Sequence, residues 1–141
     1  MTNPEVQTKK PVPIVNPWAR PHWDGAREHR LMIQRCRVCA SHVFYPRVAC
    51  PHCFSDALEW VRASGRGTVY SYTVVCNNAP SPFIGDVPYV VAVIELEEGV
   101  RMASNIVDCE LAALRCDMPV EVTFERLDDE FTLPKFRPVR G

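Results

Sequence analysis

The chain has 141 residues, the length of one small module joined to one modest domain. Hydrophobic residues make up 47% and charged residues 23%, a composition typical of a soluble globular protein that excludes a disordered chain. The net charge of −1 gives no overall attraction to nucleic acid or to an anionic membrane surface.

The start of the chain is polar and contains no apolar segment of the kind that a signal peptide needs. The longest wholly apolar run, residues 89–94, is far shorter than the ~20 residues of a membrane-spanning helix. We therefore expect a cytoplasmic protein with no membrane partner. In that reducing compartment the seven cysteines would serve as metal ligands or free thiols.

In chain order, the first predicted element is a flexible arm over residues 1–16, which are rich in turn-forming residues. A helical segment follows, because Asn16 is a suitable N-cap and Pro17 is favoured at the first helical position. Trp18, His22 and Trp23 would share one face of it. Residues 31–35 then alternate in polarity, which predicts a strand that runs into Cys36.

Two C-x-x-C motifs follow, at Cys36 with Cys39 and at Cys50 with Cys53, separated by ten residues. Zinc prefers four tetrahedral ligands, and thiolates three residues apart in a tight turn can reach the same ion. Two such turns joined by a hairpin over residues 41–49 complete a closed site with no position open for water. The spacing therefore predicts one structural Zn²⁺ ion in a rubredoxin-like zinc ribbon. Residues 17–60 would form this ribbon with its preceding helices.

Other readings of the cysteines and histidines have weaker support. A redox-active thiol pair would be expected within a βαβ pattern, which the surrounding sequence lacks. His42 and His52 lie close enough in sequence to be rival ligands, but we interpret both as surface residues. The remaining cysteines have no partner spacing, and we interpret them as small buried hydrophobic residues: Cys76, Cys109 and Cys116.

From residue 61 to residue 141 the pattern is β throughout, and it predicts a C-terminal domain of mainly β structure. Five strands are expected, over residues 68–75, 89–97, 100–107, 120–125 and 131–133. A turn at residues 97–99 joins the second strand to the third, and a longer connection over residues 108–118 follows the third. This number of strands with one longer connection suits a small closed barrel of the OB type. The glycines at residues 65 and 67 precede a strand and not a helix, so we interpret them as a bend into the barrel and not as a phosphate loop.

The ordered set of motifs resembles the DUF35 family of zinc-ribbon and OB-fold proteins. The likeness covers residues 17–138 and rests on both cysteine motifs, Trp23, Glu59 with Trp60, and residues 64–73, 87–90, 95–100, 118–122 and 133–138. One position departs from the family pattern, because Ala40 follows Cys39 where the family often has glycine. That position tends to adopt a positive φ angle, at which alanine costs about 1 kcal/mol more than glycine.

The resemblance implies a non-catalytic accessory subunit of a thiolase-fold enzyme: a thiolase, an aldolase, an acyltransferase or a synthase. Such enzymes make or break carbon–carbon bonds in acyl-CoA substrates. The zinc ribbon would dock on the catalytic subunit in a hetero-oligomer, and the OB fold would help form the passage for the coenzyme A thioester.

Three segments are candidates for contact with the partner or with CoA. Phe44, Tyr45 and Arg47 lie at the predicted ribbon tip, and aromatic residues with arginine are typical of interface cores. For Phe44 and Tyr45, packing over the zinc site is an equal alternative. Phe83 lies in the long connection 77–88, which is either a border of a ligand channel or a passive loop.

The third segment is the end of the chain, where Phe136, Arg137 and Arg140 either meet a CoA phosphate or strap the barrel. Arg35 and Arg37 near the ribbon are further phosphate candidates, together with Arg47. These arginines lie in or near the half of the chain that carries the positive charge, since residues 1–60 contain 8 basic and 5 acidic residues.

Two other functions stay open. A stand-alone acyl-CoA-binding protein would need no partner subunit. A single-stranded nucleic-acid-binding OB protein is disfavoured, because residues 61–141 contain 8 basic and 12 acidic residues, whereas such proteins line a positive groove with aromatic residues.

Overall fold

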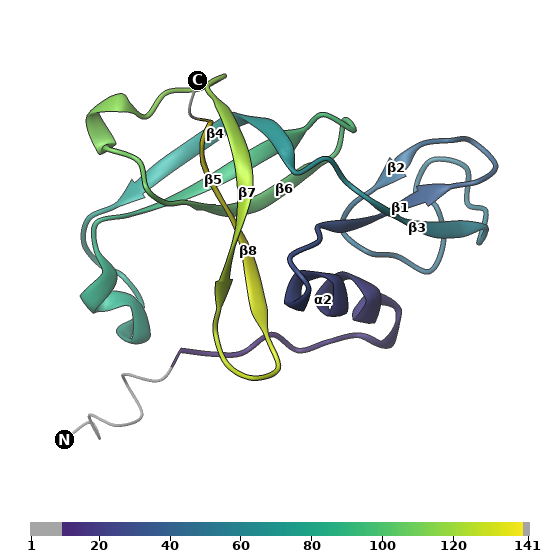
Figure 1. Ribbon diagram of the computed structural model, residues 1–141, viewed down its shortest axis with the longest axis horizontal. Helices are drawn as coiled ribbons and strands as arrows, with labels where there is room; N and C mark the ends of the chain where they lie inside the picture. Colours follow the sequence, from purple (N-terminus) through teal and green to yellow (C-terminus); the bar gives the residue numbers. More distant parts are fainter. Residues whose placement is uncertain (1–9, 140–141) are drawn as a thin grey trace.

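The structure is a computed structural model that describes residues 10–139. Residues 1–9 of the predicted arm and Arg140 lie outside the described residues, and residues 10–16 contain no helix or strand. As Figure 1 shows, the short helix and the three-stranded ribbon lie beside a β-barrel. The fold is mainly β, as the sequence predicts. No helix within residues 10–139 is long and apolar enough to span a bilayer.

The helical segment begins where Asn16 and Pro17 predict it, as a 3-10 turn η1 (Pro17–Ala19) that continues into α2 (Arg20–Arg27). Asn16 has extended backbone, but its side chain makes no capping hydrogen bond. The buried face of α2 contains His22, Gly25 and Ala26. This face packs on the ribbon and on the barrel, so that α2 holds the two parts together (Figure 1).

The ribbon is an antiparallel sheet in the order β2-β1-β3. Its strands are β1 (Met32–Cys36), β2 (His42–Val43) and β3 (Leu58–Arg62). The sequence predicted β1 and a hairpin, but β3 was missed, and the boundary expected between residues 60 and 61 falls inside it. Four residues of β3 are half-buried and the last is exposed, so its burial does not alternate as in a strand with one buried face.

The barrel is closed, with strand order β4-β5-β6-β8-β7. Its strands and connecting 3-10 turns are, in chain order, β4 (Arg66–Val75), η2 (Ser81–Asp86), β5 (Tyr89–Leu96), β6 (Arg101–Ile106), η3 (Leu111–Ala113), β7 (Pro119–Arg126) and β8 (Thr132–Pro138). Closure depends on a parallel contact between β6 and β8 at a single pair, Ile106 with Phe136. The remaining length of the β6 edge is therefore free of backbone pairing with β8.

The glycines before the barrel mark its first bend, as predicted. Gly65 has φ +80°, in the left-handed region that glycine tolerates. Gly67 lies so close to β5 that a Cβ atom there would come within 2.4 Å of the Glu95 carbonyl oxygen. The first barrel strand can therefore bend tightly against its neighbour.

One hydrophobic core joins the barrel to the ribbon. Leu31 and Ile33 of the ribbon pack in the same cluster as barrel residues such as Ile94, Val120 and Phe136. A second, much smaller cluster contains Cys36, Val43 and Cys50. The barrel therefore has a large hydrophobic core, whereas the cysteine end of the ribbon has almost none.

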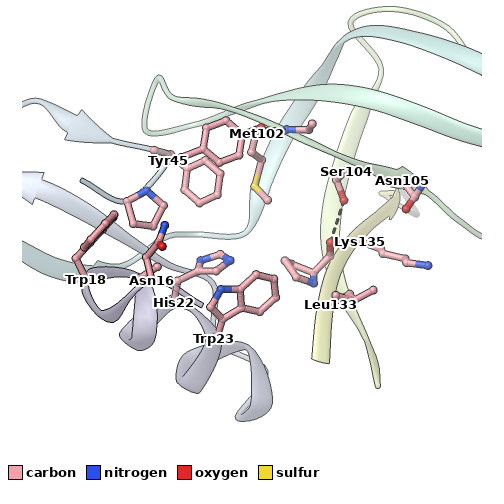
Figure 2. A pocket seen from close by; sticks show the side chains of 15 residues that line it. Asn16, Trp18, His22, Trp23, Tyr45, Met102, Ser104, Asn105, Leu133 and Lys135 are labelled. Atoms are coloured by element: carbon pink, nitrogen blue, oxygen red, sulfur yellow. Dashed lines mark hydrogen bonds between the residues drawn. The ribbon is translucent and has the colours of Figure 1, made fainter. Parts of the chain in front are cut away.

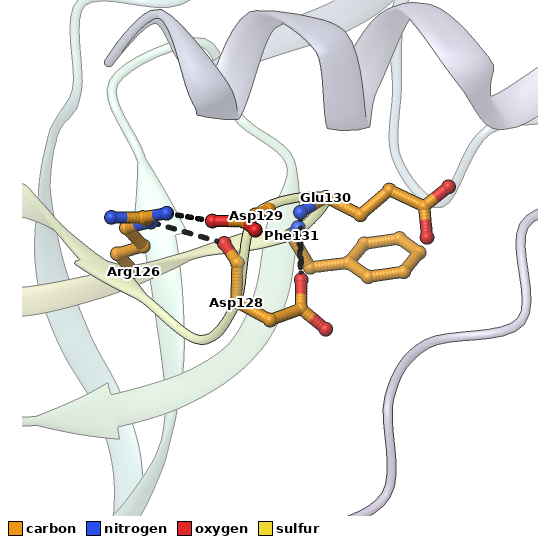
Figure 3. Close-up of polar contacts among 5 residues, drawn as sticks. All are labelled: Arg126, Asp128, Asp129, Glu130 and Phe131. Carbon is orange, nitrogen blue, oxygen red and sulfur yellow. Dashed lines mark hydrogen bonds and ion pairs between the residues drawn. The ribbon is translucent and has the colours of Figure 1, made fainter.

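The turn between β7 and β8 fixes the barrel against α2. One carboxylate oxygen of Asp128 accepts hydrogen bonds from the backbone N–H groups of Glu130 and Phe131, at 2.8 and 2.7 Å (Figure 3). Arg126 closes the other side of the turn by pairing with Asp129. The buried Phe131 ring thereby meets the Trp23 ring edge-on, with centroids 5.6 Å apart.

Candidate metal centre and docking groove

The two cysteine motifs fold into matching turns. In the first, the Ala40 N–H donates to the Cys36 carbonyl at 2.9 Å; in the second, the Phe54 N–H donates to the Cys50 carbonyl at 2.9 Å. Ala40 and Phe54 both have φ 64°, so each turn ends in the left-handed region. Backbone N–H groups also point at the sulfurs of Cys36 and Cys50, at 3.5 and 3.4 Å.

These turns bring four sulfurs together. The Sγ atoms of Cys36, Cys39, Cys50 and Cys53 all lie within 4.8 Å of one another. The pairs Cys36–Cys53 and Cys39–Cys50 are each 3.6 Å apart. Tetrahedral zinc, with Zn–S bonds of about 2.3 Å, places its sulfurs about 3.8 Å apart. The four residues therefore fit a zinc ion, and they would hold it with no position left for water or substrate.

The surroundings shift the pKa values of two of the cysteine thiols in opposite directions. Hydrogen bonds from the side chain and backbone of Ser41 lower the pKa of Cys39 to about 6. For Cys53 the backbone hydrogen bond to Ser55 acts in the same direction, but burial and the neighbouring thiols outweigh it and raise the pKa to about 12. Four thiolates this close together do not ionise without a positive charge among them, and zinc supplies that charge when bound.

His42 and His52, the alternative ligands, lie outside the cluster. Among residues 10–139, the group that contains the two cysteine motifs consists of the four cysteines alone. The prediction of buried cysteines is wrong for Cys76 and Cys116 and holds in part for Cys109, which packs against the main core. Cys76 and Cys116 are exposed and Cys109 is half-buried. Cys76 directly follows the end of β4, and Cys116 lies in the long connection after β6, so neither is on a strand that faces the core.

Replacing Ala40 by glycine is expected to stabilise the ribbon by about 1 kcal/mol, because glycine tolerates φ 64° without the steric cost that a Cβ atom brings. Urea unfolding of the zinc-loaded chain measures the change as a higher midpoint with the same slope. Ala49→Gly is the control, since Ala49 is not among the residues with positive φ. It should leave stability unchanged or lower it. An equal gain in both variants would refute strain at Ala40.

Beyond the metal centre, a hollow opens where helix, ribbon and barrel meet. It has a volume of about 390 Å³, and aromatic rings from two of the three parts line it (Figure 2). Trp18 and Trp23 come from the helical segment, and Tyr45 comes from the ribbon tip. Met102 and Leu133, from β6 and β8, form the barrel side. Trp18 and Tyr45 are 44% and 53% exposed, respectively, so large aromatic surface faces solvent.

His22 forms part of the hollow wall while being 5% exposed. Its Nδ1 lies 3.0 Å from the Met32 carbonyl oxygen and, as N–H, donates to it. Burial lowers the pKa of His22 despite this hydrogen bond. The ring is therefore neutral near pH 7, which leaves Nε2 as a hydrogen-bond acceptor.

A second hollow of about 580 Å³ continues from the first along the barrel. Both are lined by residues 103–105 of β6 and by Leu133 and Lys135 of β8, so they are two parts of one channel, which we call the β6–β8 groove. Its far end is formed by Lys10, Phe83 and Tyr89. The Lys10 ammonium lies 5.6 Å from the centre of the Phe83 ring and 2.6 Å from the Asp86 carboxylate.

The groove follows the unpaired edge of β6. There the Ala103 N–H donates to the Tyr45 hydroxyl at 3.0 Å, so a side chain of the ribbon takes the place of a neighbouring strand. The Ser104 hydroxyl donates to the Pro134 carbonyl at 2.9 Å and spans the gap to β8 (Figure 2). The edge is therefore bridged by side chains and not by a backbone ladder.

The structure separates the predicted contact residues into two groups. Tyr45 and Phe83 line the groove, and Arg47 lies exposed at the ribbon tip. Phe44 also lines the groove, while it packs against the main core and against His22, at 5.4 Å between ring centroids. Phe136 is 0% exposed inside the barrel, so its side chain does not reach the surface of this chain.

Two of the predicted arginines are engaged in ion pairs across the sheets. Arg35 of β1 meets Glu59 of β3 at 3.2 Å, and Arg137 of β8 meets Glu121 of β7 at 3.2 Å. Arg37 is exposed in the first cysteine turn. None of these three arginines is among the residues that line the β6–β8 groove.

Two family models match this chain, one for the ribbon and one for the barrel. Residues 23–59 match the family described as "ChsH2, rubredoxin-like zinc ribbon domain", and residues 60–125 match "ChsH2, C-terminal OB-fold domain". A "DUF35 domain-containing scaffold protein" from Methanocaldococcus jannaschii is 39% identical over 110 residues, which is 77% of each chain. The chain belongs to the DUF35 family.

Among solved structures, one called "Ltp2-ChsH2(DUF35) aldolase" contains a DUF35-family chain that matches with a TM-score of 0.81 and 39% identity. The match covers 90% of the present chain and 98% of that chain. A "Benzoylsuccinyl-CoA thiolase subunit BbsA" from Geobacter metallireducens is 32% identical over 93 residues, covering 63% of this chain and 58% of the relative.

Some relatives of this DUF35-family chain are longer. A "Probable enoyl-CoA hydratase alpha subunit" from Thermomonospora curvata is 38% identical over 137 residues, which is 97% of this chain but only 42% of that relative. The present chain thus spans less than half the length of that protein.

Proposed function

We propose that this protein is a non-catalytic accessory subunit in a hetero-oligomer with a thiolase-fold enzyme that acts on acyl-CoA substrates. The observation that carries the proposal is the match to the solved aldolase structure, whose name joins Ltp2 to a DUF35 chain that the present chain covers almost completely. The relative named as a thiolase subunit supports the same kind of partner.

The β6–β8 groove is the candidate passage for the CoA thioester. Its walls are mainly apolar and aromatic, with a few polar groups such as Asn105 and Lys135, as in sites that hold elongated organic ligands. The ribbon tip forms one rim through Tyr45, so a partner docked on the ribbon would cover this end of the groove. Cytoplasmic location and acyl-CoA as the ligand belong to this proposal.

The relatives named as hydratase subunits are compatible with this role. The present chain matches less than half of the Thermomonospora curvata protein, so the part of that protein outside the match is where we would place its hydratase chemistry. The shared part would then supply docking and substrate passage in both kinds of complex.

Affinity purification of the tagged chain from its native cell tests the proposal, with mass spectrometry of proteins recovered in stoichiometric amount. We expect a thiolase-fold protein to co-purify and to need this chain for full turnover of its CoA thioester. Recovery of the chain alone, together with CoA-thioester binding by the isolated monomer, would replace the proposal with a stand-alone acyl-CoA-binding protein.

A further inference from the structure

A further hollow, separate from the β6–β8 groove, lies beside the ribbon and has a different chemistry. It lies between the ribbon and the turn that joins β5 to β6, and its volume is about 390 Å³. Four side chains with basic groups line it: His42, Arg47, His52 and Arg101. We call this hollow the basic cleft.

No carboxylate belongs to the lining of the basic cleft. Among residues 10–139, neither arginine nor either histidine of the cleft takes part in an ion pair. Glu98, which precedes Gly99 at the rim, accepts a hydrogen bond from the Ser64 N–H at 2.8 Å. In residues 10–139, none of the four basic side chains of the cleft therefore has a carboxylate within ion-pair distance, although Glu95 of β5 stands opposite Arg101 in the strand register.

Groups outside the cleft hold the backbone of Arg47 and the side chain of Arg101. The backbone of Arg47 is clamped by the Gln34 side chain, which accepts from its N–H at 2.7 Å and donates to its carbonyl at 2.9 Å. Gln34 is itself only 4% exposed. The Arg101 guanidinium lies over the Tyr70 ring at 3.8 Å. A guanidinium stacked in this way keeps its in-plane N–H groups available for a ligand.

We propose that the basic cleft binds a phosphate group. Arginine forks match the oxygens of phosphate in a bidentate way, and histidine N–H groups add further donors. The stacked Arg101 guanidinium loses little side-chain entropy on binding, which favours a specific anion site over a diffuse basic surface. The phosphate can be a free ion or the phosphorylated end of a nucleotide. The site does not depend on the accessory role proposed above.

A different role for the same cations is to offset the charge of the zinc centre, since Zn²⁺ with four thiolates carries a net charge of −2. His52 is adjacent to Cys53 in sequence, so this role is a direct competitor. The two roles predict different effects of replacing the arginines. If the cleft binds phosphate, phosphate affinity falls; if the arginines offset the charge of the zinc centre, zinc retention falls.

The test is calorimetric titration of the full-length, zinc-loaded chain with adenosine 3′,5′-bisphosphate at low salt, and competition by inorganic phosphate. Adenosine is the matched ligand without phosphate. We expect the bisphosphate to bind and adenosine not to bind. Arg47→Gln and Arg101→Gln should each weaken binding at least about tenfold, because each removes a charged hydrogen-bond donor. Arg62→Gln, an exposed arginine at the end of β3, should change affinity less than about twofold.

Competition by inorganic phosphate would identify the bare ion as sufficient, whereas binding that phosphate does not displace would assign the site to a nucleotide. Either result supports the proposal. Equal binding of adenosine, equal loss in Arg62→Gln, or no binding of either phosphate by the wild-type chain would overturn it. Loss of zinc from the Arg47 and Arg101 variants would instead assign the arginines to the metal centre.

Discussion

Replacing Cys50 by serine is expected to remove zinc from the protein and to unfold the ribbon. Cys50 is completely buried, and its sulfur is one of four that would hold the ion. Zinc binding in small sites contributes on the order of 10 kcal/mol to folding, and the cysteine end of the ribbon has an apolar cluster of only three buried residues to replace it. Metal analysis should show zinc falling from one ion per chain to almost none.

The loss is expected to spread beyond the metal centre, because Leu31 and Ile33 of the ribbon belong to the same core as the barrel. Hydrogen exchange should show loss of protection in β1 and β3 first, with weaker protection at the barrel seam. Cys116→Ser is the control, since Cys116 is exposed and outside the cluster. A Cys50→Ser protein that keeps a full zinc ion and wild-type stability would contradict the assignment.

The metal centre was predictable because its chemistry is local in sequence. Two C-x-x-C turns form from a few consecutive residues each, and a positive φ at Ala40 follows from the turn geometry. The strands β4 to β7 were also predictable, since branched and aromatic residues, the alternation over residues 120–125 and the turn at residues 97–99 define them. The strand β8 was expected only over residues 131–133, but it extends to Pro138. Its two prolines disfavour a strand by propensity, and packing against β7 outweighs that preference.

The groove could not be predicted in the same way. Its lining comes from segments that are distant in sequence: the helix, the ribbon tip, β6, β8 and, at the far end, Lys10 and Phe83. Trp18 and Trp23 were expected to share one face of the helical segment, but no local pattern indicates that Trp18 faces a hollow shared with Met102. Phe136 shows the opposite error: its position near two arginines made it a contact candidate, whereas it is fully buried in the barrel core.

Replacing Trp18 by alanine is expected to weaken binding of the catalytic subunit at least about 30-fold while leaving the isolated chain folded. Truncation of an interface tryptophan at a hot spot typically costs 2 kcal/mol or more. Trp18 is 44% exposed, and η1 contains no buried residue, so the isolated chain loses little packing. Calorimetry or surface plasmon resonance with the co-purified partner would measure the affinity, and thermal unfolding would confirm the fold.

Leu111→Ala is a matched control, because Leu111 is also 44% exposed but lies on η3, outside the groove lining. If both variants bind the partner as tightly as the wild-type chain, the aromatic rim is not the docking surface. Normal affinity of Trp18→Ala combined with slower turnover would instead assign this rim to substrate passage. Weaker binding by Trp18→Ala alone would show that the partner covers the hollow between helix, ribbon and barrel, which Trp18 lines.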